Sequence, residues 1–172
     1  KIIEILKKAE LKKGLSIEDA GYLINVDIKN KDHKEMIEMI FKTAGKIKKE
    51  IYGERLVFFA PLYVSSFCIN DCDYCGFHCR NTAPRKKLTL KEVEQQVKCL
   101  VDMGHKRLLL EFGEDKEKCP IDYVVDVIKT IYNTKSKNGE IRRVNVNIAA
   151  TSVEDYKKLK SVGIGTYQLF QE

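Results

Sequence analysis

The stretch Leu56–Gly76 reads LVFFAPLYVSSFCINDCDYCG, an apolar, β-rich run that leads directly into three closely spaced cysteines. Its first part, Leu56–Val64, is nearly continuous in apolar residues, which is typical of a strand buried on both faces. Cys68, Cys72 and Cys75 follow with the spacing Cys-x3-Cys-x2-Cys. The stretch therefore predicts a buried strand that ends in a loop with metal or redox chemistry.

Apolar strands and capped helices alternate after this loop. Further strands are expected at residues 106–112, 143–149 and 166–170. The helices between them are expected to begin at Thr89 with Glu92, at Pro120, and at Ser152 with Asp155. Strand and helix in alternation with short links predict an α/β fold with a parallel sheet, either doubly wound or a (β/α)8 barrel.

One strand favours the barrel. In the run 143–149, Val144, Val146 and Ile148 alternate with Asn145 and Asn147, so one face of the strand is polar. Parallel strands are normally apolar on both faces. A barrel lumen that holds a polar ligand explains the pattern, and two asparagines satisfied by neighbouring backbone explain it equally well.

The first fifty residues are different in character. Helical spacing of apolar residues predicts helices from residue 2, from Ser16 with Asp19, and over about Asp32–Ile51. We therefore expect a helical N-terminal extension over 1–54 and the core domain over 55–172. Both chain ends interrupt a structural pattern, so we expect a piece of a longer protein.

Composition limits the function classes. The chain has 172 residues, 44% apolar content and a net charge of +6, with many of its lysines on the early helices. A solvated helix face accounts for that charge, and no nucleic-acid-binding signature accompanies it. No signal-peptide pattern or apolar run of about 20 residues occurs, so we expect a soluble cytoplasmic protein without membrane or nucleic-acid partners.

The cysteine loop has two metal interpretations. Three thiolates can hold three irons of a cubane cluster and leave the fourth iron open to a small molecule. Structural zinc is the alternative, with His78 or Cys79 as its fourth ligand, but the second Cys-x2-Cys pair of most zinc sites is missing. The spacing favours the iron–sulfur cluster.

Cys-x3-Cys-x-aromatic-Cys, with Tyr74 as the aromatic residue, resembles the defining motif of the radical S-adenosylmethionine (SAM) superfamily. Within it the chain resembles the tyrosine lyases of iron-only hydrogenase maturation, and less closely the lyases of thiamine biosynthesis. The segments that carry this resemblance are 60–66, 75–77, 103–107, 110–115, 119–123, 142–151 and 163–172.

The resemblance implies the N-terminal half of a (β/α)8 barrel that binds a 4Fe-4S cluster and SAM. Electron transfer from the cluster, supplied by a donor such as ferredoxin or flavodoxin, would split SAM to a 5′-deoxyadenosyl radical. The radical would attack L-tyrosine, whose Cα–Cβ bond then breaks to p-cresol and dehydroglycine (2-iminoacetate). Dehydroglycine would supply carbon monoxide and cyanide in an anaerobic cytoplasm, alongside other hydrogenase maturases. The alternatives are the 2-iminoacetate synthase of thiamine biosynthesis or another radical SAM enzyme, and a zinc-stabilised binding module without catalysis.

The resemblance also implies residue roles. Cluster ligands would be Cys68, Cys72 and Cys75. Residues that bind SAM would be Tyr74, Phe112, Gly113, Glu114, Arg143, Asn147, Thr151 and Glu172. The turn Phe112–Glu114 would accept hydrogen bonds from the ammonium group of SAM, although Phe112 replaces the first glycine of the usual motif. Glu172 would bind the ribose hydroxyls of SAM. Cys99 is expected to lie in a helix, with its side chain in the hydrophobic core.

Overall fold

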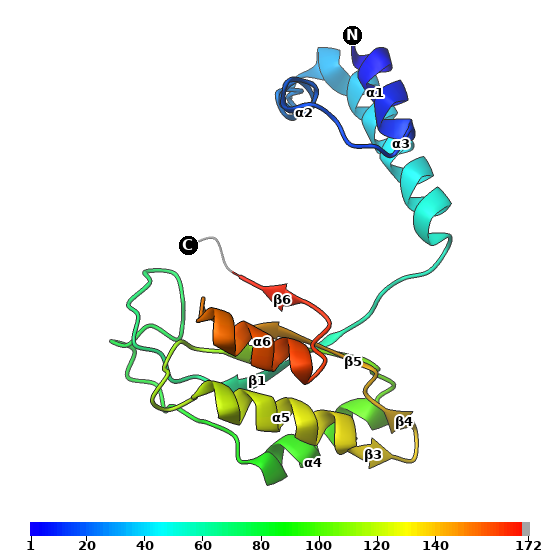
Figure 1. The fold of residues 1–172 in the computed structure, drawn as a ribbon. Helices are drawn as coiled ribbons and strands as arrows, with labels where there is room; N and C mark the ends of the chain where they lie inside the picture. The colour runs from blue at the N-terminus through cyan, green and yellow to red at the C-terminus, as the bar shows by residue number, and fades with distance from the viewer. Residues whose placement is uncertain (170–172) are drawn as a thin grey trace. The chain divides into compact units, whose positions relative to one another are not determined.

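A computed structural model of the chain describes residues 1–169, which form two compact units, Lys1–Val57 and a second unit from Phe58 onward. Figure 1 labels the helices and strands. Each unit is described by itself. No helix within residues 1–169 is long and apolar enough to cross a membrane.

The first unit is helical, as predicted. It contains α1 (Ile2–Glu10), α2 (Ile17–Ile24), a 3-10 turn η1 (Lys31–His33) and α3 (Lys34–Tyr52). The Ser16 hydroxyl accepts a hydrogen bond from the Asp19 amide at 3.1 Å and so caps α2. The Asp19 carboxylate also pairs with Lys8 at 2.7 Å, which joins α2 to α1.

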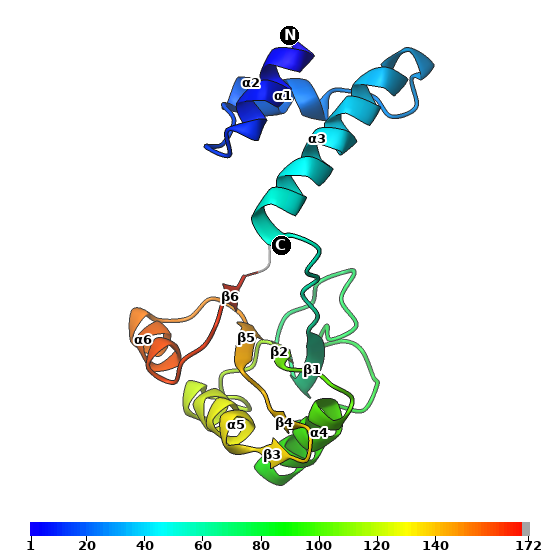
Figure 2. The same ribbon diagram turned by 90° about the vertical axis from the view of Figure 1, so that its right-hand side faces the viewer.

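The second unit has a parallel sheet of four strands in the order β1-β2-β5-β6 (Figure 2). The strands are β1 (Ala60–Ser65), β2 (Arg107–Phe112), β5 (Arg143–Asn147) and β6 (Tyr167–Gln168). The helices between them are α4 (Leu90–Asp102), α5 (Ile121–Asn133) and α6 (Val153–Ser161). The predicted α/β class is therefore confirmed, and the Thr89–Glu92 capping box is present at the start of α4.

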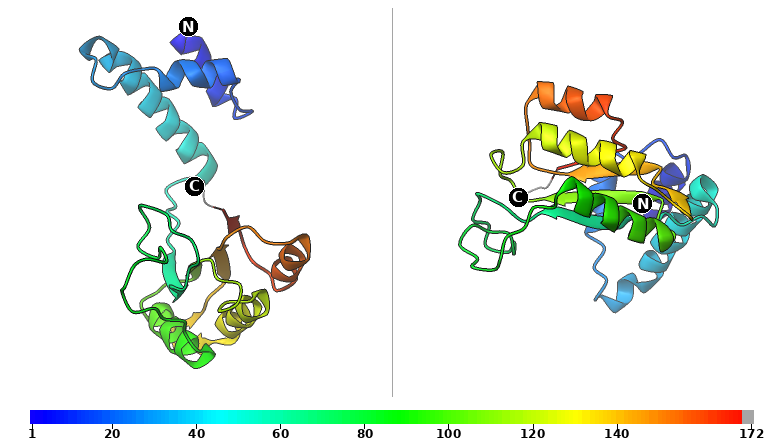
Figure 3. Two further views of the ribbon diagram at one scale, coloured as in Figure 1. Left: turned by 90° about the vertical axis from the view of Figure 1, so that its left-hand side faces the viewer. Right: turned by 90° about the horizontal axis from the view of Figure 1, so that it is seen from below.

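The three helices cover one face of the sheet and form the hydrophobic core with it (Figure 3). Leu108, Leu110 and Phe112 point to this face from β2, and Val144 and Val146 from β5. Because side chains alternate along a strand, the residues between them point to the opposite face. That second face carries the polar positions of the sheet.

The first strand begins later than predicted. Leu56–Phe59 was expected to be buried strand, but all four side chains are exposed and β1 starts at Ala60. The register explains the difference, because Ala60 pairs with Leu108 near the beginning of β2. By this register only Phe59 lies opposite a residue of β2, Arg107, whereas residues 56–58 extend past the beginning of that strand, where no ladder can hold them.

Other boundaries differ in smaller ways. A short antiparallel hairpin, β3 (Lys135–Ser136) with β4 (Gly139–Glu140), precedes β5 and was not predicted. Cys99 is exposed rather than in the core, because α4 buries Val93, Val97 and Val101 on its other face. The last predicted strand, 166–170, reaches into residues outside the described range.

Truncating the core of the second unit is expected to lower its stability strongly. Leu110 is completely buried in β2. Leu110→Ala should lower the free energy of unfolding by about 2–5 kcal/mol, since it removes apolar contacts and leaves a cavity. Met103→Ala is the control, because that side chain is 73% exposed, and should change stability by less than about 0.5 kcal/mol. Urea unfolding measures both, and equal losses would contradict the assignment of the core.

Candidate functional site

The cysteine loop borders a large cavity at the carboxyl ends of β1, β2 and β5. The cavity has a volume of about 910 Å³. Its lining includes Cys68, Cys72, Cys75, Glu111, Glu114 and Asn147. Carboxyl ends of parallel strands are where β/α folds place their chemistry, because the loops that follow the strands gather at that edge.

Backbone hydrogen bonds attach the cysteine loop to the end of β2. The Ile69 amide donates to the Glu114 carbonyl at 2.8 Å, and the Gly113 amide donates to the Ser65 carbonyl at 2.9 Å. Gly113 lies so close to the loop that an added Cβ would be 2.3 Å from the Phe67 carbonyl oxygen. A glycine is therefore required at the point where β2 meets the loop.

Arg85 holds the two ends of the loop together. Its guanidinium donates to the carbonyls of Ser66 at 2.8 Å, Phe77 at 2.9 Å, His78 at 2.5 Å and Asn81 at 3.2 Å. A guanidinium presents five N–H donors in a planar fork, which suits it to several carbonyls at once. Sequence reasoning missed this residue, because a single arginine after Pro84 has no pattern that distinguishes it from a surface charge.

The donor set fits an iron–sulfur cluster better than zinc. The three cysteines line one cavity, whereas His78 and Cys79, the possible fourth zinc ligands, are not among its lining residues. The His78 ring instead contacts the Asp71 carboxylate at 3.2 Å.

The three thiols are nevertheless not gathered into a ready ligand group. Throughout the part of the chain that the structure describes, no three His, Cys, Asp or Glu side chains are grouped closely enough to hold a metal ion. Metal binding and the ordering of a ligand loop are coupled, so the cluster itself would draw the thiolates together. Cluster ligation by Cys68, Cys72 and Cys75 stays a prediction.

Glu111 is a site residue that sequence reasoning missed. Its half-buried carboxyl group lines the cavity from the polar face of β2. Burial raises the pKa of Glu111, and a hydrogen bond from the Asn147 side chain opposes that rise. The available signal was one carboxylate inside the apolar run 106–112, since a charge there needs a polar environment.

The residues expected to bind SAM fall into two groups. Phe112, Gly113, Glu114 and Asn147 line the cavity. Tyr74, Arg143 and Thr151 are not among its lining residues, and Glu172 lies outside the described residues.

The positions of the second group have clear local reasons. Tyr74 is 76% exposed on the loop. Arg143 starts β5, at the opposite end of the strand from Asn147, and donates to the Gly165 carbonyl at 2.9 Å. Its position therefore does not support a role in SAM binding and agrees with a charge at the start of a strand.

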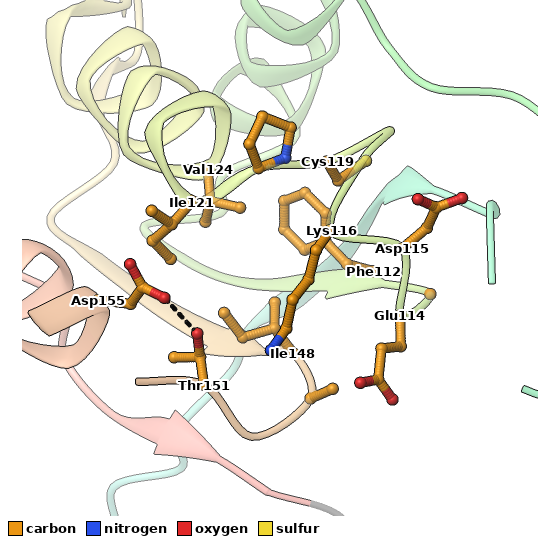
Figure 4. A pocket seen from close by; sticks show the side chains of 13 residues that line it. Phe112, Glu114, Asp115, Lys116, Cys119, Ile121, Val124, Ile148, Thr151 and Asp155 are labelled. Atoms are coloured by element: carbon orange, nitrogen blue, oxygen red, sulfur yellow. Dashed lines mark hydrogen bonds between the residues drawn. The ribbon is translucent and has the colours of Figure 1, made fainter. Parts of the chain in front are cut away.

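Thr151 belongs to a smaller cavity of about 200 Å³ beside α5 and α6 (Figure 4). Its hydroxyl donates to the Asp155 carboxylate at 2.5 Å, and this hydrogen bond lowers the pKa of Asp155. Phe112 and Glu114 line both cavities. Thr151 is thus near the site but is engaged at the start of α6.

The parallel sheet and the three-cysteine loop, together with comparisons with known proteins, indicate that the chain belongs to the radical SAM superfamily and carries the N-terminal part of its barrel. No family model matches the chain. A solved structure of HydG, a maturase of the [FeFe]-hydrogenase, is similar to it, with 59% identity and a TM-score of 0.93. The match covers 99% of this chain and 37% of HydG.

Two further relatives agree with this similarity. The HydG maturase of Carboxydothermus hydrogenoformans is 41% identical with a TM-score of 0.82, over 99% of this chain and 38% of that protein. The 2-iminoacetate synthase of Salmonella typhimurium is 30% identical over 80% of this chain and 35% of its own length. The chain thus spans little more than a third of these relatives.

Proposed function

We propose that the chain is the N-terminal part of a radical SAM lyase that cleaves the Cα–Cβ bond of L-tyrosine to p-cresol and dehydroglycine. One observation carries the proposal: the three cysteines of the loop and the turn Phe112–Glu114 line the same cavity. The HydG relatives, and the Salmonella enzyme named as a 2-iminoacetate synthase, support tyrosine as the substrate. Hydrogenase maturation, with carbon monoxide and cyanide as products, is the pathway that the HydG similarity favours.

The chain's own residues would bind and orient the reactants. Cys68, Cys72 and Cys75 would hold a 4Fe-4S cluster, which when bound supplies the electron for reductive cleavage of SAM. The Glu114 carboxylate, which accepts a hydrogen bond from Asn70 at 2.6 Å, would also accept hydrogen bonds from the ammonium group of SAM. The apolar walls beside Phe112 would exclude water from the reactive centre. A ferredoxin or flavodoxin would deliver electrons, and the setting would be an anaerobic cytoplasm.

A chimera tests the reaction. Residues 1–172 are joined to the remaining C-terminal part of the 59%-identical HydG, reconstituted with iron and sulfide, and incubated anaerobically with SAM, reductant and tyrosine. We expect p-cresol from the chimera and none from the chain alone, because the chain lacks most of its relatives' length. A folded chimera with intact cluster that splits SAM but leaves tyrosine untouched would contradict the proposal. Release of p-cresol by residues 1–172 alone would contradict the expectation that this chain is inactive without the C-terminal part.

A further inference from the structure

A polar row crosses the sheet on the face that points away from the helices. Tyr63 of β1 is in register with Glu111 of β2, and Glu111 is in register with Asn147 of β5. All three side chains line the 910 Å³ cavity. The row therefore forms part of the wall against which a ligand would lie.

Asn147 has an unused acceptor in this row. The residue is only 6% exposed, and its Oδ1 atom is buried without a hydrogen-bond partner among the residues of the described range. Buried polar atoms in native proteins are nearly always hydrogen-bonded, so an exception calls for an absent partner. By contrast, the Asn145 side chain two positions earlier accepts a hydrogen bond from Arg143 at 3.3 Å.

Glu111 adds a negative charge without a cation beside it. Within residues 1–169 it forms no ion pair, and the cavity lining contains no Lys, Arg or His side chain. Asp71 and Glu114 also line the cavity, but Asp71 is paired with Arg80 at 2.5 Å and Glu114 accepts from Asn70. Glu111 is therefore a half-buried carboxylate that accepts a hydrogen bond from Asn147, while no cation of the described residues offsets its charge.

The two groups together define what would satisfy them. The Asn147 side chain donates a hydrogen bond to the Glu111 carboxylate. The Oδ1 atom of Asn147 and the remaining lone pairs of the carboxylate are then left as acceptors on two neighbouring strands. Such strands lie about 4.8 Å apart, a separation that one small donor group can bridge. An ammonium group has three donors and a positive charge, whereas a hydroxyl group has one donor and no charge.

We propose that Glu111 and Asn147 form a subsite that binds the ammonium group of an α-amino-acid ligand in the cavity. The proposal rests on the proposed function for the identity of that ligand, since both SAM and tyrosine carry such a group. If the ligand is tyrosine, Glu114 keeps its role toward the ammonium of SAM; if the ligand is SAM, this subsite takes over that role from Glu114. The subsite would act on specificity, because it selects ligands that keep the amino group. An analogue without that group would leave a buried acceptor and a carboxylate unsatisfied.

Paired ligands test the subsite by calorimetric titration under anaerobic conditions. L-Tyrosine is compared with 3-(4-hydroxyphenyl)propionate, and SAM with 5′-methylthioadenosine, so that the second member of each pair lacks the ammonium group. Glu111→Gln keeps the shape of the side chain. It should weaken binding of L-tyrosine or of SAM by about ten- to a hundredfold, and it should leave the affinity for the analogue that lacks the ammonium group unchanged. Asn147→Ala should act in the same direction, and Asn145→Ala is the matched control.

The outcomes separate this subsite from the proposed function. The arm that responds, tyrosine or SAM, identifies the ligand. Equal weakening of both members of each pair, no weakening at all, or no binding of either ammonium ligand by the wild type would overturn the subsite. Iron uptake by Glu111→Gln should equal that of the wild type. Failure of the wild type itself to take up iron would count against the proposed function, while the tyrosine arm, which needs no cluster, would still decide the subsite.

Discussion

Cys72→Ala is expected to abolish the visible absorbance that the protein gains on anaerobic reconstitution with iron and sulfide. With two thiolates left on the cavity wall, the cluster would lose one of its three anchors, and bound iron should fall by more than about tenfold, since even residues that only support metal ligands cost 10–100-fold in affinity. Absorption spectra and iron analysis measure the loss.

Cys99→Ala provides the matched control for this experiment. Cys99 is exposed on α4, so its removal should leave both the spectrum and the iron content unchanged. Zinc in place of iron in the purified wild type, lost from Cys72→Ala, would refute the cluster and favour the zinc-stabilised module. Loss of iron in both variants would indicate nonspecific binding by thiols.

Gly113→Ala is expected to damage the site with a single added methyl group. The new Cβ would lie 2.3 Å from the Phe67 carbonyl oxygen and 3.0 Å from the Cys68 Cβ. Because the obstacle is backbone, the cysteine loop must move away from β2, at a cost of about 1–3 kcal/mol in the free energy of unfolding. Iron uptake should fall as well, since the Cys68 side chain is displaced.

Gly76→Ala adds the same methyl group within the cysteine loop. No atom lies within 4 Å of its Cβ position, so stability should change by less than about 0.5 kcal/mol. Urea unfolding and iron analysis of the two variants give the comparison. If Gly113→Ala matched Gly76→Ala in both measurements, the close approach of β2 and the loop would be wrong.

Much of this fold is encoded locally and could be predicted. The Thr89–Glu92 box predicts the start of α4 because its hydrogen bonds join residues three apart. The start of β1 could not be predicted in this way. Leu56–Phe59 has strong strand propensity, but whether it joins a sheet depends on how far β2 extends, which is a property of another segment.

The candidate site likewise has features that local sequence predicts and features that depend on distant segments. The cysteine spacing is visible within eight residues of sequence, so the loop was predicted. Glu111 and Asn147 lie 36 positions apart, and only the register of β2 with β5 brings them together. Asn147 was expected to point to a lumen or to be satisfied by backbone, and its unpartnered Oδ1 within the described structure favours the lumen.

The four carbonyls held by Arg85 bear on how the proposed cluster would be rebuilt after a loss of iron. A guanidinium stays protonated at every pH that a folded protein tolerates, and its hydrogen bonds do not involve the thiols. If the iron were lost, the segment between Ser66 and Asn81 would remain tied at its base. Fresh iron and sulfide would then need to order only the cysteine-bearing turn, so repair could proceed without refolding of the whole segment.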